Sequence, residues 1–228
     1  IVNQSIFIDV SNNTIDAKDV FAGSLAGYSS TRISDCYSAG SVDVRINGSY
    51  ISGAVGGIVG RCSSIKNCYN LGGVRLSKTS NSFEDVGGVA GGGKAYNCYN
   101  VGRVSFHDLS GVEERAGITT SGDSYNYYLD VSVLADEGLD STLCGVGTSL
   151  TSSQMMQKNS YVGFDFEDEW YIEENGQYPY PQLVKVPFVS VENKKEFAGG
   201  SGTYFDPYII STQDHLNNVR NYMGAYYK

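Results

Sequence analysis

Residues 57–76 read GIVGRCSSIKNCYNLGGVRL, and near-copies of this segment stand on both sides of it. GSLAGYSSTRISDCYSAGSVDV (residues 23–44) precedes it, and GVAGGGKAYNCYNVGRVSF (residues 88–106) follows it. The cysteines of the three copies, Cys36, Cys68 and Cys98, are separated by 32 and then 30 residues. Self-similarity at a nearly fixed period of this length is the sequence signature of a repeat architecture.

Each copy divides into three short apolar pieces separated by glycine or polar turns. In the middle copy these pieces are residues 57–60, 65–69 and 74–76. Such pieces are too short for helices and too evenly spaced for long hairpins. We therefore predict an all-β fold: a right-handed parallel β-helix, or β-solenoid, with rungs of about 30 residues and short capping helices.

Stacked rungs would bring equivalent residues together as ladders along one axis, because neighbouring strands lie about 4.8 Å apart. The predicted inward ladders are aliphatic (Leu25, Ile58, Val89, Ile118), valine (Val42, Val74, Val104) and cysteine (Cys36, Cys68, Cys98). A fourth, more divergent copy (AGITTSGDSYNYYL, residues 116–129) puts Tyr127 where the cysteine stood, 29 residues after Cys98.

A polar residue precedes the cysteine in each copy, at the point where the strand should bend. These residues are Asp35, Asn67, Asn97 and, in the fourth copy, Asn126. Asn and Asp tolerate the left-handed conformation, and stacked amides can hydrogen-bond along the axis. We predict a turn ladder, with a metal site as the alternative interpretation of the same column.

A tyrosine follows the cysteine, and the predicted column is Tyr37, Tyr69, Tyr99 and Tyr128. If the rings point outward, they form a flat ridge suited to sugar rings or to the apolar patch of a partner protein. If they point inward, they belong to the core. Both alternatives remain open at this point.

Two segments of the middle copy resemble a known motif. Gly57-Ile58-Val59-Gly60 and residues 67–72 (NCYNLG) are similar to the GLUG motif, a repeat of large bacterial surface and secreted proteins. The resemblance covers about residues 20–130, although the fourth copy lacks the cysteine and the final glycine. The resemblance implies that the chain is similar to adhesin-like proteins or to the non-catalytic regions of some secreted metallopeptidases. It says little about activity.

The sequence predicts three parts. Residues 1–132 would form the solenoid, and residues 133–185 a closing segment with a capping box at Thr151-Ser152-Ser153-Gln154 and a pair of aromatic strands. Phe164, Phe166, Trp170 and Leu183 would cover the last rung. Residues 186–228 would be a linker and the start of a following β-helix unit, whose helix carries Leu216, Val219 and Met223 on one face.

Composition and charge limit the kinds of molecule that this chain is expected to bind. The formal charge of −9 disfavours nucleic acid, because phosphate binding requires a clustered basic surface. No apolar run approaches the roughly 18 residues of a membrane-spanning helix. The start lacks a basic leader, so we interpret the chain as a mature protein or a piece of a longer one, with flanking domains expected. Five cysteines cannot all pair internally, and their spacing is not that of a zinc knuckle.

Catalytic motifs are missing from the sequence. Neither His107 nor His215 lies in an H-E-x-x-H motif, and no nucleophile elbow or Walker A loop occurs. Asp165, Glu167 and Glu169 would share one face of a strand, as solvated residues, as part of a structural calcium shell, or as catalytic acids. We predict no enzyme and no cofactor, although structural calcium is possible.

The sequence therefore favours a secreted or cell-surface scaffold, similar to an adhesin, that presents a binding face to host or cell-surface glycans or proteins. Two alternatives remain: the non-catalytic region of a large secreted enzyme such as a surface metallopeptidase, and a polysaccharide-acting β-helix enzyme.

Overall fold

The structure is a computed structural model with two compact units. One comprises Ile1–Ile172 with Tyr180–Val186, and the other Glu173–Pro179 with Pro187–Lys228. The described residues are 5–10, 19–46, 52–78, 84–108, 115–122, 125–132, 145–172, 179–185, 198, 207–212, 215–216, 219 and 226–228. Residues from both the predicted solenoid (1–132) and the predicted closing segment (133–185) lie in the first unit, and the three-part division stays a prediction.

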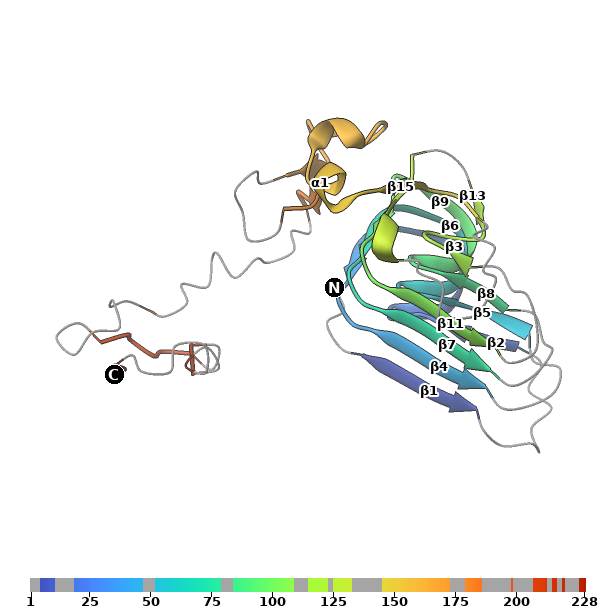
Figure 1. Cartoon of the computed structure of the whole chain (residues 1–228), viewed down its shortest axis with the longest axis horizontal. Helices are drawn as coiled ribbons and strands as arrows, with labels where there is room; N and C mark the ends of the chain where they lie inside the picture. Colours follow the sequence, from blue (N-terminus) through green and yellow to red (C-terminus); the bar gives the residue numbers. More distant parts are fainter. Residues whose placement is uncertain are drawn as a thin grey trace. The chain divides into compact units, whose positions relative to one another are not determined.

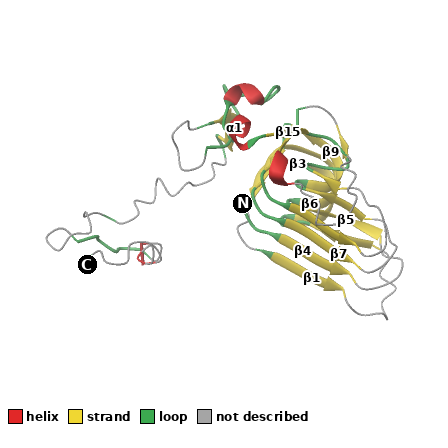
Figure 2. Ribbon diagram, in the orientation of Figure 1, coloured by secondary structure: helices red, strands yellow, loops and turns green. Residues whose placement is uncertain are grey.

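The first unit consists mainly of β-strands that pair in parallel, so the predicted all-β class is confirmed at that level (Figures 1 and 2). One four-stranded sheet has the order β1-β4-β7-β11. Its strands are β1 (Ile6–Val10), β4 (Val42–Ile46), β7 (Val74–Lys78) and β11 (Val104–Asp108). Val42 pairs with Val74 and Val74 with Val104, so the predicted valine ladder is confirmed, and all three side chains are fully buried.

A second four-stranded sheet has the order β12-β8-β5-β2 and is also parallel. Its strands are β2 (Asp19–Ala22), β5 (Ser52–Gly56), β8 (Glu84–Gly87) and β12 (Arg115–Ala116). Ala22, Val55 and Val86 from this sheet pack with the valines of the first sheet in one buried cluster. Alternation along each strand sends every second side chain to this interior.

The largest sheet contains the long strands that carry the cysteines. Its strands are β3 (Ala26–Ser38), β6 (Val59–Asn70), β9 (Ala90–Tyr96), β10 (Tyr99–Asn100), β13 (Ser121–Gly122), β14 (Tyr127–Leu129) and β15 (Thr148–Leu150). The chain bends before each cysteine, where Asp35, Asn67 and Asn97 have φ values of 56°, 51° and 52°. The predicted left-handed bend ladder is confirmed at these three positions.

Burial follows position in the stack. Ile58, Val89 and Ile118 lie in a second buried cluster together with Cys68 and Cys98. Leu25 continues the same backbone ladder, since its N–H donates to the carbonyl oxygen of Ile58, yet its side chain is 47% exposed. Leu25 is thus exposed where the predicted ladder would bury it, because β3 is paired only with β6 among the described strands.

Glycines in the repeats allow successive copies to approach closely. A Cβ added to Gly72 would lie 2.0 Å from the carbonyl oxygen of Gly40, and a Cβ on Gly102 would lie 1.9 Å from that of Gly72. Real Cβ atoms do not approach backbone oxygen this closely. The spacing of the copies at this turn therefore requires glycine, for reasons of space rather than of φ.

The closing segment begins with a short helix, α1 (Ser152–Met155), followed by a 3₁₀ turn at Lys158–Ser160. The predicted capping box is confirmed: Gln154 N–H donates to Thr151 Oγ1, and the Gln154 side chain accepts from the Thr151 N–H. The helix is a single turn that ends at Met155. The predicted aromatic strand pair is reduced to β16 (Trp170–Tyr171), which pairs antiparallel with β17 (Gln182–Leu183).

In the second unit, Tyr208 forms a parallel bridge with Tyr227. Thr212 Oγ1 accepts from the His215 N–H, which is the hydrogen bond of a helix N-cap residue. Val219 is described but Met223 lies outside the described residues, so the predicted apolar helix face stays a prediction. Across the described parts of both units, no helix is long and apolar enough to cross a membrane.

Candidate binding surface

The cysteines of successive copies lie in file on neighbouring strands. Cys36 pairs with Cys68 in register, and Cys98 directly precedes Tyr99, which pairs with Tyr69. Each thiol donates to the carbonyl oxygen two residues earlier, at 3.0 Å for Cys36, 3.1 Å for Cys68 and 3.2 Å for Cys98. The predicted cysteine ladder is thus confirmed, while Cys144 lies outside the described residues.

The polar column before the cysteines is a bend ladder. Asn67 Nδ2 donates to Asp35 Oδ1 at 3.4 Å, and also to the carboxylate of Glu169 in the closing segment. Among the described residues, no group of three or more His, Cys, Asp or Glu side chains is placed to hold a metal ion.

The fourth copy is displaced by one residue from the predicted alignment. Tyr127 pairs with Tyr99, so Tyr125 occupies the bend position with φ 68°, and Asn126 occupies the position of the cysteine. Asn126 Nδ2 donates to the Ala95 carbonyl oxygen, and its Oδ1 accepts from the Cys98 N–H. All three predictions for this copy are wrong for this reason: Asn126 at the bend, Tyr127 at the cysteine position and Tyr128 in the tyrosine column.

A second polar ladder lies inside the fold, and the sequence analysis did not single it out. Asn70 and Asn100 are fully buried and pair in register, and Asn70 Nδ2 donates to Asn100 Oδ1 at 2.9 Å. Each amide also exchanges two hydrogen bonds with the glycine two residues later, Gly72 or Gly102. The NCYN quartet was the available signal, because it occurs in both the second and the third copy.

The tyrosine column is stacked and buried. The rings of Tyr37 and Tyr69, and those of Tyr69 and Tyr99, have centroids 4.9 Å apart and interplanar angles of 14° and 5°. Exposure is 3% for Tyr37 and zero for Tyr69 and Tyr99. The predicted exposed ridge is not formed. Tyr128 is half-buried against both apolar clusters, so it does not continue the column either.

The closing segment covers this column from the side opposite to the thiols. Trp170, 1% exposed, lies with its ring 6.0 Å from those of both Tyr69 and Tyr99. Tyr99 Oη donates to the Pro181 carbonyl oxygen at 2.6 Å, and Tyr127 Oη to that of Val162 at 2.9 Å. Burial raises the pKa of Tyr127, so at neutral pH its phenol stays a neutral donor. The segment therefore packs along several copies instead of covering only the last.

The acidic residues of the closing segment do not share a strand face. Asp165 to Glu169 form a turn in which Asp165 Oδ1 accepts from the N–H groups of Glu167 and Asp168 at 2.9 and 3.0 Å. These two bonds lower the pKa of Asp165. The predicted common face of Asp165, Glu167 and Glu169 is wrong, because Asp165 is engaged in the turn and Glu169 contacts Asn67.

An aromatic pair of one half-buried and one exposed ring lies at the beginning of the first copy and just before it. The rings of Phe21 and Tyr28 are 5.5 Å apart and tilted by 47°, and Tyr28 is 60% exposed. Arg61 places its guanidinium 5.8 Å from the Phe21 centroid and forms an ion pair with Asp85 at 2.9 Å. We call Phe21, Tyr28, Arg61 and Asp85 the aromatic–arginine patch. It combines a ring face with donors and acceptors of hydrogen bonds.

The repeat alignment explains why this patch is specific to one copy. Phe21 pairs in register with Ala54, and Tyr28 pairs with Arg61. The next copy thus has a small and a cationic residue where the first has aromatic rings. Comparing the copies at these positions was the signal that could have located the patch from sequence.

A second exposed ring lies on the outer face of the sheet that contains β1. Phe7 is 57% exposed, and the Arg45 guanidinium lies 5.0 Å from its centroid. Arg45 is also 3.9 Å from the carboxylate of Asp43. The pairing of an arginine with an exposed ring therefore occurs on two sheets of the first unit.

Comparisons with known proteins give one short similarity. No family model matches the chain, and no solved structure matches it. A 31-residue stretch is 61% identical to a protein of Evansella cellulosilytica described as "Putative Gly-rich membrane protein". The stretch is 14% of this chain and 4% of that protein.

Proposed function

We propose that this chain is a right-handed β-solenoid segment of GLUG-like repeats, and that it is a non-enzymatic scaffold located outside the cell or on its surface. The observation that carries the proposal is the pairing of equivalent residues one copy apart, as in Val42 with Val74 and Val74 with Val104. A coil with one strand of each sheet in every rung accounts for this register.

The binding face of the scaffold is the aromatic–arginine patch, and its ligand is a glycan. Sugar rings stack on exposed aromatic faces, and their hydroxyls hydrogen-bond to guanidinium and carboxylate groups. Arg61 is 45% exposed at its side chain and Asp85 is 11% exposed, so the arginine is the more available of the two to a ligand. The scaffold fixes the patch because Phe21, Tyr28, Arg61 and Asp85 all lie on strands.

A glycan array with purified protein tests the binding face. Tyr28→Ala and Phe21→Ala are expected to lower binding at least about tenfold, the equivalent of a lost aromatic contact of about 1.4 kcal/mol. Tyr125→Asn is the matched control: it removes a 49% exposed ring, at a bend where Asn67 and Asn97 stand in other copies. Equal binding by all three variants and the parent chain, or no binding at all, contradicts the proposal.

Location and lack of catalysis are tested separately. Brief protease treatment of intact cells of the source organism is expected to release peptides of this chain before the cells lyse. Incubation with acidic and neutral polysaccharides, with and without calcium, is expected to yield neither reducing ends nor unsaturated products. Peptides found only after lysis argue against the surface location, and product formation argues against a pure scaffold.

A further inference from the structure

The side chains of Cys36 and Cys68 extend from neighbouring strands toward the same apolar cluster. The two residues are direct partners in the parallel pairing of β3 with β6. Partners on adjacent strands are about 4.8 Å apart, which lies within the Cα separation of about 4.4–6.8 Å that disulfides span. Cys68 belongs to the buried cluster, and Cys36 is packed against it. Both thiols therefore lie on one side of the sheet.

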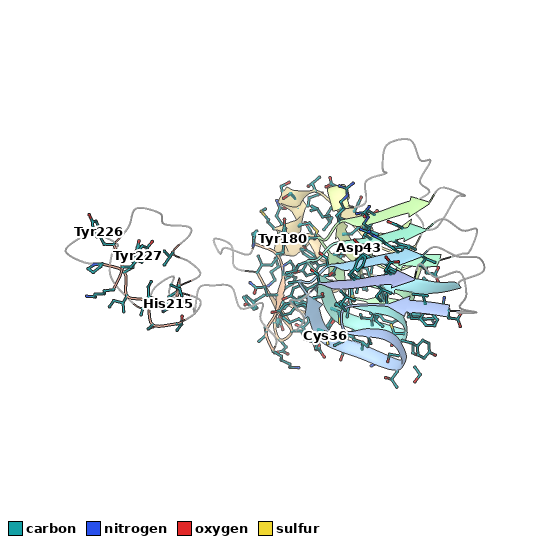
Figure 3. The ribbon with its side chains drawn as sticks, turned by 90° about the horizontal axis from the view of Figure 1, so that it is seen from below. Cys36, Asp43, Tyr180, His215, Tyr226 and Tyr227 are labelled. Atoms are coloured by element: carbon teal, nitrogen blue, oxygen red, sulfur yellow. The ribbon has the colours of Figure 1, made fainter. Side chains whose placement is uncertain are left out.

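The two thiols differ in their access to solvent. Cys68 and Cys98 have no exposed surface. Cys36, which is labelled in Figure 3, is half-buried. The difference arises because β3 pairs only with β6 among the described strands, while β6 has neighbours on both sides. A solvent-borne reagent consequently meets Cys36 first.

The pKa values of Cys36 and Cys68 are shifted in opposite directions. The protonated Cys36 thiol donates to the Ser34 carbonyl oxygen, but a hydrogen bond from Cys68 lowers the pKa of Cys36 to about 7, so the thiolate forms near neutral pH. Burial raises the pKa of Cys68 well above its ordinary value. Cys62, on the same strand as Cys68, has its pKa raised to about 11 by burial. Thiolate is the reactive form, so Cys36 is the nucleophile of the group.

We propose that Cys36 and Cys68 are a redox-active pair that forms a disulfide between adjacent repeats by exchange with a small-molecule disulfide of the glutathione type. The Cys36 thiolate attacks one sulfur of the small disulfide, whose S–S bond breaks and releases one small thiolate. The Cys68 sulfur then attacks Cys36 in the mixed disulfide, and a second small thiol leaves with the Cys68 proton. Two protein thiols are oxidised, and one small disulfide is reduced to two thiols.

Oxidised glutathione is the probe for the test. After incubation with the full chain, we expect a mass loss of about 2 Da relative to the reduced protein and a cross-linked peptide that joins Cys36 to Cys68. Cys36→Ala abolishes the cross-link, whereas Cys98→Ala, the matched variant one copy further along, retains it. Far-UV circular dichroism of each variant establishes that it is folded.

Three results overturn the proposal. These are a stable glutathione adduct on Cys36 without a cross-link, a cross-link between Cys68 and Cys98, and survival of all thiols. The pH profile adds an independent readout, since the rate of Cys36 consumption should rise with a midpoint near pH 7, below that of an ordinary thiol. A midpoint at or above the ordinary range likewise overturns it.

Discussion

In each of the first three copies the cysteine and the tyrosine that follows it point to opposite faces of the same sheet. The two faces are buried in different ways. The thiols face an interior that the repeats build for themselves, together with Ile58 and Val89. The tyrosines face the other side of the strand and are covered by a segment outside the repeat pattern, through Trp170 and Tyr161. Periodicity alone therefore buries one face of this sheet, whereas the other face requires a dedicated partner.

The substitution Trp170→Ala should have the largest effect, because it removes the side chain that covers the tyrosine face. The Trp170 side chain is 1% exposed and lies 4.6 Å, ring to ring, from Phe164 as well as against the tyrosines. We expect the free energy of unfolding to fall by about 3–5 kcal/mol, as for other buried large-to-small substitutions. Urea titration followed by circular dichroism measures it.

Phe166→Ala is the control for that substitution, because Phe166 is only half-buried and contacts Tyr161 and Phe164 within the same segment. Its loss should cost clearly less than the loss of Trp170. Equal costs would mean that the closing segment stabilises itself and that the tyrosine column gains little from it.

Two substitutions at equivalent ladder positions test how much burial in the repeat interior contributes to stability. Ile58 and Leu25 stand at equivalent ladder positions, but Ile58 is 1% exposed and Leu25 is 47% exposed. Ile58→Ala should lower the free energy of unfolding by about 2–5 kcal/mol, and Leu25→Ala by less than about 1 kcal/mol. Similar losses in the two urea titrations would show that Leu25 is covered in solution.

Substitutions in the buried asparagine ladder should lower the free energy of unfolding less than substitutions in the apolar core. Asn100→Ala removes the acceptor of Asn70 Nδ2 and both bonds to Gly102. Leaving buried polar groups without partners costs about 1–3 kcal/mol, and this is the decrease we expect in the free energy of unfolding. Ser63→Ala, on the exposed face of β6, should be nearly neutral in the same thermal or urea measurement.

The smallest effect concerns the acidic turn. The pKa of Asp165 is lowered in the folded chain by two backbone N–H donors. Its contribution is therefore present above the ordinary aspartate range and is lost as pH falls through the lowered folded pKa. Stability measured from pH 7 down to pH 2 should fall slightly less steeply for Asp165→Asn than for the parent chain. An unchanged slope contradicts this assignment.

Local patterns predicted the parts of the fold that depend on repetition. The valine and cysteine ladders, the left-handed bends at Asp35, Asn67 and Asn97, and the Thr151 capping box all follow from residue type and spacing. The fourth copy was misaligned by one residue, because tyrosines at three nearby positions, Tyr125, Tyr127 and Tyr128, offered equivalent matches. Only the strand pairing distinguishes among them.

The candidate site was less accessible to sequence reasoning. Whether the tyrosines are open or covered depends on Trp170 and Pro181, which lie more than 60 residues further along the chain, and no periodicity connects them. The aromatic–arginine patch likewise joins β2, β3, β6 and β8, so its members meet only once the strands are paired. Such contacts depend on tertiary arrangement and have no local signature.

The glycine contacts between copies restrict how this chain can change over evolutionary time. A Cβ at Gly72 or Gly102 would overlap the backbone of the neighbouring copy, so replacing either glycine requires that backbone to shift. Duplication of an entire copy brings a compatible glycine with it and meets no such obstacle. The number of copies can therefore change by whole repeats, whereas the glycines at these turns must be retained.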